Sequence, residues 1–149
     1  MKQLQFLIKP AAGHCNMRCH YCFYRDEQQN CTDTEDYMMS LATAETLIRR
    51  CFAELDKGGF VSFAFQGGEP TLAGLDFFRF FTQTVQKYNQ KRVTVQYAIQ
   101  TNGLAVTEEW AEFFSKEHFL VGISLDGTPD VHDALRPDAQ GLSLIHISE

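Results

Sequence analysis

The sequence predicts an α/β fold built around a parallel β-sheet. Short apolar or β-branched runs alternate with longer segments whose apolar residues recur every three or four positions, in the order strand, helix, strand, helix, strand, helix, strand. This alternation is typical of parallel sheets with right-handed crossovers. Every unusual polar motif directly follows a predicted strand, where α/β folds carry their chemistry. The 149 residues, 44% of them hydrophobic, suffice for one core.

The first half of the chain contains one predicted strand, a long loop and one predicted helix. Residues 4–8 form an apolar run that Pro10 prevents from continuing as a strand. Residues 26–39 are polar and acidic, which indicates a surface loop. Residues 40–57 show an apolar stripe at helical spacing, and a glycine pair then ends the helix. Cys51 lies on that stripe, so we interpret it as a core residue rather than a metal ligand.

The second half repeats the alternation. Residues 60–65 are rich in strand formers, and residues 75–88 carry phenylalanines at helical spacing. Residues 93–99 alternate as a strand does. Thr107 can cap a third helix, whose first turn holds two glutamates near its positive end. Residues 119–123 complete the set as a fourth strand.

Three cysteines crowd the loop after the first strand. Cys15, Cys19 and Cys22 form a C-x3-C-x2-C pattern, which favours a soft metal centre. Iron–sulfur clusters are normally held by four cysteines, so three would leave one iron open for chemistry. The alternative is structural zinc, with His14 or His20 as the fourth ligand.

Composition excludes some classes of function. The net charge is −6 and no lysine or arginine cluster occurs, which argues against a nucleic-acid partner. The run at 4–8 is too short for a secretory signal or a membrane span. An odd number of cysteines, five, without such a signal points to a reducing compartment, so we expect a cytoplasmic location and no membrane association. We interpret Cys31 as a bystander in its acidic loop.

The remaining polar motifs share one predicted rim. Gly-Gly-Glu-Pro at 67–70 follows the second strand, Gln-Thr-Asn-Gly at 100–103 follows the third, and Ser-Leu-Asp-Gly at 124–127 follows the fourth. Each is an ordinary turn sequence when taken alone. Because the carboxyl ends of parallel strands share one edge, their joint placement beside the cysteine loop predicts a common site.

Together these motifs resemble the anaerobic sulfatase-maturating enzymes of the radical S-adenosylmethionine (SAM) superfamily, over residues 1–141. The resemblance implies the N-terminal part of a partial (β/α)6 TIM-like barrel. It implies a 4Fe–4S cluster with one open iron, and S-adenosylmethionine as cosubstrate. The implied activity is generation of a 5'-deoxyadenosyl radical, which removes a hydrogen from Cβ of a sulfatase cysteine or serine on the way to Cα-formylglycine.

The resemblance also carries residue roles. Cys15, Cys19 and Cys22 would bind the cluster, and Tyr21 would lie beside it in contact with S-adenosylmethionine. The other implied S-adenosylmethionine contacts are Gly67, Gly68, Glu69, Pro70, Ser124 and Arg136. Three amide side chains on the rim would orient the substrate backbone: Gln66, Gln100 and Asn102. We expect His132 to be a surface residue rather than a proton carrier.

The resemblance further implies partners. The substrate would be a protein or peptide, an unfolded sulfatase, and the electron donor a flavodoxin or ferredoxin. A thioether-forming or other peptide maturase of the same superfamily is the alternative enzyme. A zinc-stabilised interaction module is the alternative from a different class.

The last eight residues, 142–149, resemble a translated sequencing adapter, so we set them apart from the domain at 1–141. On this interpretation the family's auxiliary clusters and proton-accepting aspartate would lie beyond Gly141, so no catalytic base is assigned here. We expect the chain alone to be inactive and poorly soluble, because its outer strands would expose unpaired edges.

Overall fold

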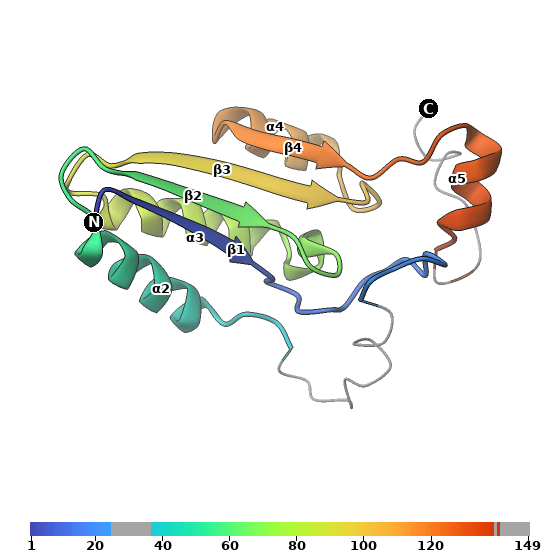
Figure 1. Cartoon of the computed structure of the whole chain (residues 1–149), viewed down its shortest axis with the longest axis horizontal. Coiled ribbons are helices and arrows are strands. Elements are labelled where there is room, and N and C mark those ends of the chain that lie inside the picture. The colour runs from blue at the N-terminus through green and yellow to red at the C-terminus, as the bar shows by residue number, and fades with distance from the viewer. Residues whose placement is uncertain (25–36, 139, 141–149) are drawn as a thin grey trace.

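The protein is built on a four-stranded, all-parallel sheet. The computed structural model describes residues 1–24, 37–138 and 140. The strands lie in the order β1-β2-β3-β4 (Figure 1). Their bounds are β1 Gln3–Ile8, β2 Phe60–Phe65, β3 Thr94–Thr101 and β4 Phe119–Ile123. The predicted parallel α/β fold is therefore confirmed.

Three crossover helices lie along the sheet, and further helical turns lie at the carboxyl ends of the strands. The crossovers are α2 (Leu41–Glu54), α3 (Leu75–Tyr88) and α4 (Glu108–Lys116). A 3-10 turn, η1 (Pro70–Ala73), follows β2, and α5 (Pro129–Leu135) follows β4 beyond the strand arrowheads (Figure 1).

Helix α2 illustrates how local sequence sets these elements. Ser40 caps its first turn, with its hydroxyl oxygen accepting from the Thr43 amide at 3.1 Å. The helix ends at Glu54, three residues before the predicted end, because Leu55 already has an extended backbone. Cys51 is only 2% exposed and packs in the core as predicted.

An aromatic cluster joins the helices to the sheet. The Phe63 and Phe65 rings of β2 each meet the Phe81 ring of α3 edge-on, with centroids 5.1 Å apart. Phe119 of β4 stacks on Tyr97 of β3 at 4.9 Å. Burying these large rings against one face fixes which side of each strand faces the helices.

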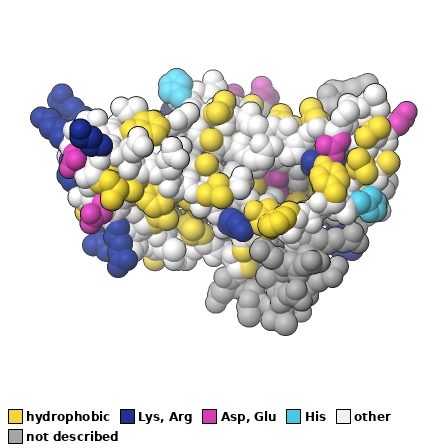
Figure 2. Space-filling model, viewed as in Figure 1, with side chains coloured by type: hydrophobic (Ala, Val, Ile, Leu, Met, Phe, Trp, Pro, Cys, Tyr) yellow, Lys and Arg dark blue, Asp and Glu magenta, His cyan; other side chains and the backbone are white. Residues whose placement is uncertain are grey.

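The opposite face of the sheet, called the open face, carries exposed side chains in the described part of the chain. Leu7 of β1 is 59% exposed and Leu120 of β4 is 65% exposed. Hydrophobic side chains are spread over the face turned toward the viewer in Figure 2. β1 and β4 are the two edge strands of the sheet.

The structure corrects several boundaries. β3 continues through Gln100 and Thr101, which pair with Gly122 and Ile123 and so belong to a strand rather than to the following turn. Helix α5 and the 3-10 turn were not predicted. Thr107 occupies the N-cap of α4, but its side chain makes no capping hydrogen bond.

Some predictions fall outside the described residues: most of the acidic loop at 26–39, with Cys31, and the terminal segment 142–149. Among the described residues, no helix combines the length and the apolar character needed to cross a membrane.

Candidate functional site

A cavity of about 320 Å³ opens at the carboxyl ends of the strands. Its lining contains every predicted site residue except Pro70, which is buried as the first residue of η1. Those lining residues are Cys15, Cys19, Tyr21, Cys22, Gln66, Gly67, Gly68, Glu69, Gln100, Asn102, Ser124 and Arg136. Residues from the cysteine loop and from the ends of β2, β3 and β4 thus meet, as the rim argument predicted.

Backbone hydrogen bonds hold the cysteine loop (residues 14–22) on two sides. The Glu69 amide donates to the His14 carbonyl at 2.7 Å, which ties the loop to the Gly-Gly-Glu-Pro bend. On the other side, the Arg18 amide donates to the Pro137 carbonyl at 2.8 Å, and the His20 amide donates to the Leu135 carbonyl at 3.0 Å. The loop is therefore positioned by main-chain contacts that do not depend on side-chain chemistry.

The bend needs glycine because the loop lies so close to it. A Cβ at Gly68 would lie 2.0 Å from the His14 carbonyl oxygen, and a Cβ at Gly67 would lie 2.7 Å from that of Ala12. Gly67 also has a φ of 121°, in the region that side chains rarely adopt. Gly68 therefore admits the backbone at the start of the cysteine loop, and Gly67 admits the segment just before it.

Glu69 supports the bend from inside. Its side chain is 1% exposed, and one oxygen accepts from the Thr71 amide at 3.1 Å and from the Thr71 and Thr101 hydroxyls at 2.6 and 2.7 Å. The other oxygen accepts from the Asn102 amide at 2.8 Å. Glu69 therefore ties the end of β2 to the end of β3, and its carboxylate is already occupied by protein donors.

The cysteine thiols sit in a partly buried, weakly polar environment. Burial raises the pKa of Cys15 to about 11, although the Met17 amide donates to its sulfur at 3.4 Å. Burial also raises the pKa of Cys19, an effect that the Arg136 guanidinium opposes. Without a metal the raised pKa values keep the Cys15 and Cys19 thiols protonated at neutral pH, so a metal would have to displace their protons.

The donor set fits an iron–sulfur cluster in kind. Three soft ligands from one loop line a single cavity, and Ser124 and Arg136 line the same cavity. As the side chains are placed, no three His, Cys, Asp or Glu residues in the described ranges form a group that could hold a metal ion. His14 and His20 are the residues considered as a fourth ligand for zinc. The His14 ring stacks on the Tyr37 ring with centroids 3.5 Å apart, and His20 is exposed.

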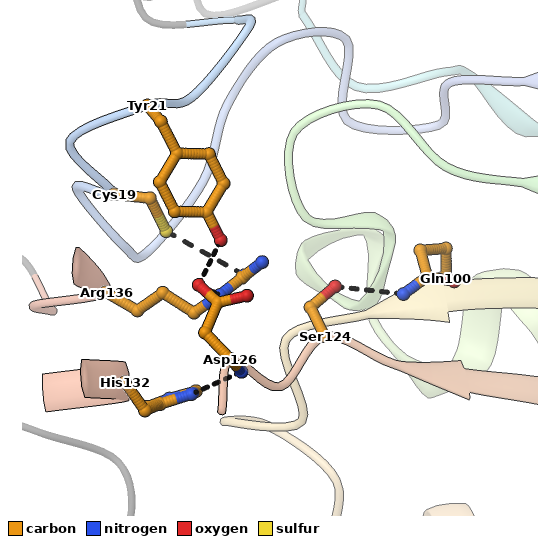
Figure 3. Close-up of polar contacts among 7 residues, drawn as sticks. All are labelled: Cys19, Tyr21, Gln100, Ser124, Asp126, His132 and Arg136. Carbon is orange, nitrogen blue, oxygen red and sulfur yellow. Dashed lines mark hydrogen bonds and ion pairs between the residues drawn. The ribbon is translucent and has the colours of Figure 1, made fainter. Parts of the chain in front are cut away.

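A polar network closes one end of the cavity (Figure 3). Tyr21 points from the cysteine loop to Asp126 and donates its hydroxyl hydrogen to the Asp126 carboxylate. Arg136 donates from Nε to the same carboxylate oxygen at 2.8 Å. The Arg136 Nη1 atom lies 4.0 Å from the Cys19 sulfur. These bonds from Tyr21 and Arg136 hold the pKa of Asp126 below its usual range.

The amide side chains on the rim make contacts of their own. Gln100 donates to the Ser124 hydroxyl at 2.9 Å (Figure 3). Asn102 donates to the Asn16 side-chain oxygen at 2.8 Å and lies 3.6 Å from the Cys15 sulfur. Asn102 therefore touches the cysteine loop directly.

His132 corrects the sequence-based prediction. It is 1% exposed, not a surface residue, and its Nδ1 accepts from the Asp126 amide at 3.3 Å. Its Nε2 is buried without a hydrogen-bond partner among the described residues. Asp126 and His132 are the site residues whose roles sequence reasoning missed. The Ser-Leu-Asp-Gly motif was a signal for Asp126, whereas nothing local marked His132 as buried.

The fold and site define a class: a parallel βα-repeat protein with a three-cysteine loop and a glycine-rich bend at the carboxyl rim of its sheet. The chain belongs to the radical SAM superfamily, whose family model matches residues 11–140. This membership favours the cluster interpretation of the cysteines over a zinc-stabilised module.

Individual relatives are more specific. The chain is 52% identical over 139 residues to a cysteine-type anaerobic sulfatase-maturating enzyme of Clostridium novyi, covering 93% of this chain and 37% of that protein. It is 35% identical over 138 residues to a serine-type anaerobic sulfatase-maturating enzyme of Klebsiella aerogenes, covering 92% and 33%.

A solved structure described as native anSMEcpe with bound AdoMet and Kp18Cys peptide superposes with a TM-score of 0.87 at 40% identity. The match covers 97% of this chain and 38% of that one. The chain therefore spans about a third of the length of these relatives, from 33% to 38%.

Proposed function

We propose that this chain is the N-terminal part of an anaerobic sulfatase-maturating enzyme. The observation that carries the proposal is the meeting of three cysteines, a glycine bend, Ser124 and Arg136 around one cavity at the strand ends. Relatives of both the cysteine and the serine type, and a structural neighbour with bound AdoMet and a peptide, support it. We set the boundary of the radical SAM core at residue 141, one residue beyond the family match.

In this proposal Cys15, Cys19 and Cys22 are the ligands of the 4Fe–4S cluster. When bound, the cluster and S-adenosylmethionine supply the electron and the 5'-deoxyadenosyl radical that starts oxidation of the substrate at Cβ. Cys51 takes no part, because it is buried in the helical layer.

The remaining rim residues bind and orient S-adenosylmethionine. The Arg136 guanidinium is a planar donor suited to the cosubstrate's carboxylate, and the Ser124 hydroxyl is a neighbouring donor or acceptor. Tyr21 provides an aromatic wall that limits water access to the cluster. The 67–70 bend would lie near the ammonium group of S-adenosylmethionine. Gly67 and Gly68 would contact this group through their backbone. Glu69 and Pro70 would act by holding the bend in place rather than by direct contact.

A peptide substrate would extend along the open face of the sheet. A second hollow of about 370 Å³ lies there, and Gln66 and Gln100 line both hollows. Amide side chains at that junction can pair with peptide N–H and C=O groups, and Asn102 adds a third amide at the cysteine loop. The partners would be an unfolded sulfatase and a flavodoxin or ferredoxin as electron donor.

The test uses the full-length protein, purified and reconstituted without oxygen. We expect iron and sulfide in cluster amounts, cleavage of S-adenosylmethionine to 5'-deoxyadenosine, and formylglycine in a sulfatase-derived peptide detected by mass spectrometry. Paired cysteine and serine peptides identify the preferred target. Cys19→Ala should lose the iron, whereas the core control Cys51→Ala should retain it.

Two results would overturn the proposal. Cosubstrate cleavage with no change to either sulfatase peptide, together with a new thioether in a different peptide, would assign the protein to another maturase activity. Stoichiometric zinc with no uptake of iron would remove the radical chemistry altogether.

A further inference from the structure

We propose that Asp126 is a positioning residue that aims the terminal amino groups of Arg136 at the carboxylate of S-adenosylmethionine. The inference rests on the proposed function, in which Arg136 binds that carboxylate. Asp126 itself does not line the cavity, so its effect on the cosubstrate must pass through its neighbours.

The geometry assigns the Asp126 carboxylate to the inner edge of the guanidinium. It accepts from Arg136 Nε at 2.8 Å, which leaves both terminal nitrogens uncommitted to this ion pair. One of them, Nη1, lies 4.0 Å from the Cys19 sulfur, on the cluster side of the cavity. A ligand carboxylate would therefore be bound end-on by the terminal pair, because the Nε side is already taken.

The same carboxylate oxygen fixes the face of the guanidinium. It accepts the hydroxyl hydrogen of Tyr21, a residue 105 positions away in the sequence. The Arg136 guanidinium carbon lies 5.3 Å from the centre of the Tyr21 ring, close enough for a cation–π contact. The Asp126 carboxylate thus orients both the Tyr21 ring and the Arg136 guanidinium, and it links the cysteine loop to the end of α5.

Asp126 is itself held from behind. Its amide donates to Nδ1 of the buried His132 at 3.3 Å, which anchors the turn after β4 on α5 (Figure 3). The side chains of Arg136 and Asp126 are 15% and 24% exposed, so water competes only weakly for their ion pair. This is the arrangement of an outer carboxylate that orients an inner ligand-binding group.

The opposite effect also has a physical basis. A carboxylate beside a guanidinium neutralises part of its charge and could weaken its attraction for an anion. Orientation should prevail here because Arg has many rotamers, and a ligand that must first order the side chain loses affinity. Whether substitution of Asp126 lowers or raises the affinity for S-adenosylmethionine decides between the two effects.

The test compares Asp126→Asn with Asp130→Asn in the full-length, cluster-loaded protein. Asp130 is an exposed carboxylate in the first turn of α5, so its variant controls for the loss of one charge. Binding is measured for S-adenosylmethionine and for its decarboxylated analogue, which lacks the group that Arg136 would bind. Iron content and melting temperature are measured on the same samples.

We expect D126N to bind S-adenosylmethionine about 10-fold more weakly, or worse, while its affinity for the decarboxylated analogue changes less than about 2-fold. D130N should match the wild type with both ligands. Arg136→Ala should reproduce the D126N pattern, and the double variant should add little to R136A.

Equal or tighter binding of S-adenosylmethionine by D126N would overturn the inference. An equal loss for both ligands, with lower iron content or melting temperature, would also overturn it, because it would show a merely structural role. Failure of the wild-type protein to bind S-adenosylmethionine at all would instead refute the proposed function.

Discussion

Glu69 shows how one residue can shape a site through hydrogen bonds inside the protein. Its buried carboxylate receives hydrogen bonds from Thr71, Thr101 and the Asn102 amide. Each partner is a donor, so the position requires a group that only accepts. Hydrogen bonding within the protein therefore explains why the bend has an acidic residue at this position.

Glu69→Gln should destabilise the protein by about 2 kcal/mol, because the new amide N–H₂ would face donors inside the protein. Denaturant unfolding at neutral pH measures the change. Glu54→Gln, at an exposed position in the last turn of α2, should change stability by less than about 0.5 kcal/mol. If E69Q and E54Q unfold at the same denaturant concentration, the hydrogen bonds of Glu69 do not stabilise the bend.

Gly122 makes room for Gln100 between two strands. A Cβ at Gly122 would lie 2.3 Å from the Gln100 side-chain oxygen, so Gly122→Ala must displace that amide. Gln100 is a flexible exposed side chain, and we expect a stability loss below about 0.5 kcal/mol. The Gln100 to Ser124 bond should be lost, and with it part of the proposed affinity for S-adenosylmethionine.

Ser124→Ala is the comparison: it removes the same bond without a clash, and it also removes the hydroxyl proposed to contact S-adenosylmethionine, so its loss of affinity should be at least as large. Calorimetric binding of S-adenosylmethionine should fall in both variants while their melting temperatures stay close to that of the wild type. A normal affinity in G122A would show that the position of Gln100 is irrelevant to cosubstrate binding.

At the scale of elements, the predictable features were those with a strong local pattern. β2 and β4 have the predicted bounds because each is a short run of apolar strand formers. α3 likewise matches the predicted residues 75–88, since its phenylalanines recur at helical spacing. Their joint order was enough to predict the parallel sheet and the shared rim.

The unpredicted features depend on partners distant in sequence. β3 continues through Gln100 and Thr101 because β4 is there to pair with them. α5 is only seven residues long, too short to show a helical repeat. The burial of His132 and the link from Tyr21 to Asp126 arise only when the cysteine loop and the β4 end meet in space.

A polar contact, here called the clasp and made by the side chains of Glu45, Lys87 and Tyr88, also joins α2 to α3. Glu45 accepts from Lys87 at 3.1 Å and from the Tyr88 hydroxyl at 2.9 Å. The bonds from Lys87 and Tyr88 lower the pKa of the Glu45 carboxyl. A carboxyl whose folded pKa is lowered contributes stability above its unfolded pKa of about 4.3, and this contribution disappears as pH falls through the folded value.

Glu45→Gln should therefore be slightly less stable than the wild type at pH 7, and the difference should shrink below about pH 4. Denaturant unfolding at several pH values checks the trend. The effect is small because the clasp is exposed to solvent. E54Q, which alters a glutamate elsewhere on the same helix, should show no such pH-dependent difference, and an identical profile for both variants would contradict the clasp.

At the scale of the whole molecule, β1 and β4 are the outer strands of the sheet, and each pairs with only one other strand in the described part of the chain. Leu120, Ile123 and Leu125 expose 65%, 54% and 69% of their surface at or just after β4. An apolar edge strand with unpaired backbone groups is a template for pairing with another chain. We therefore predict that the 149-residue chain associates with itself when it is expressed alone.

Leu120→Lys should reduce this association, because a lysine on an exposed edge strand disfavours pairing with another chain, and its charge would be buried if the open faces of two chains packed together. Light scattering over a concentration series measures the effect, and the variant should remain monomeric at concentrations where the parent chain does not. Leu41→Lys adds the same charge at an exposed leucine that begins α2, away from either edge, and should associate like the parent. If both variants scatter equally, net charge rather than the β4 edge governs solubility, and a monomeric parent chain would remove the edge argument entirely.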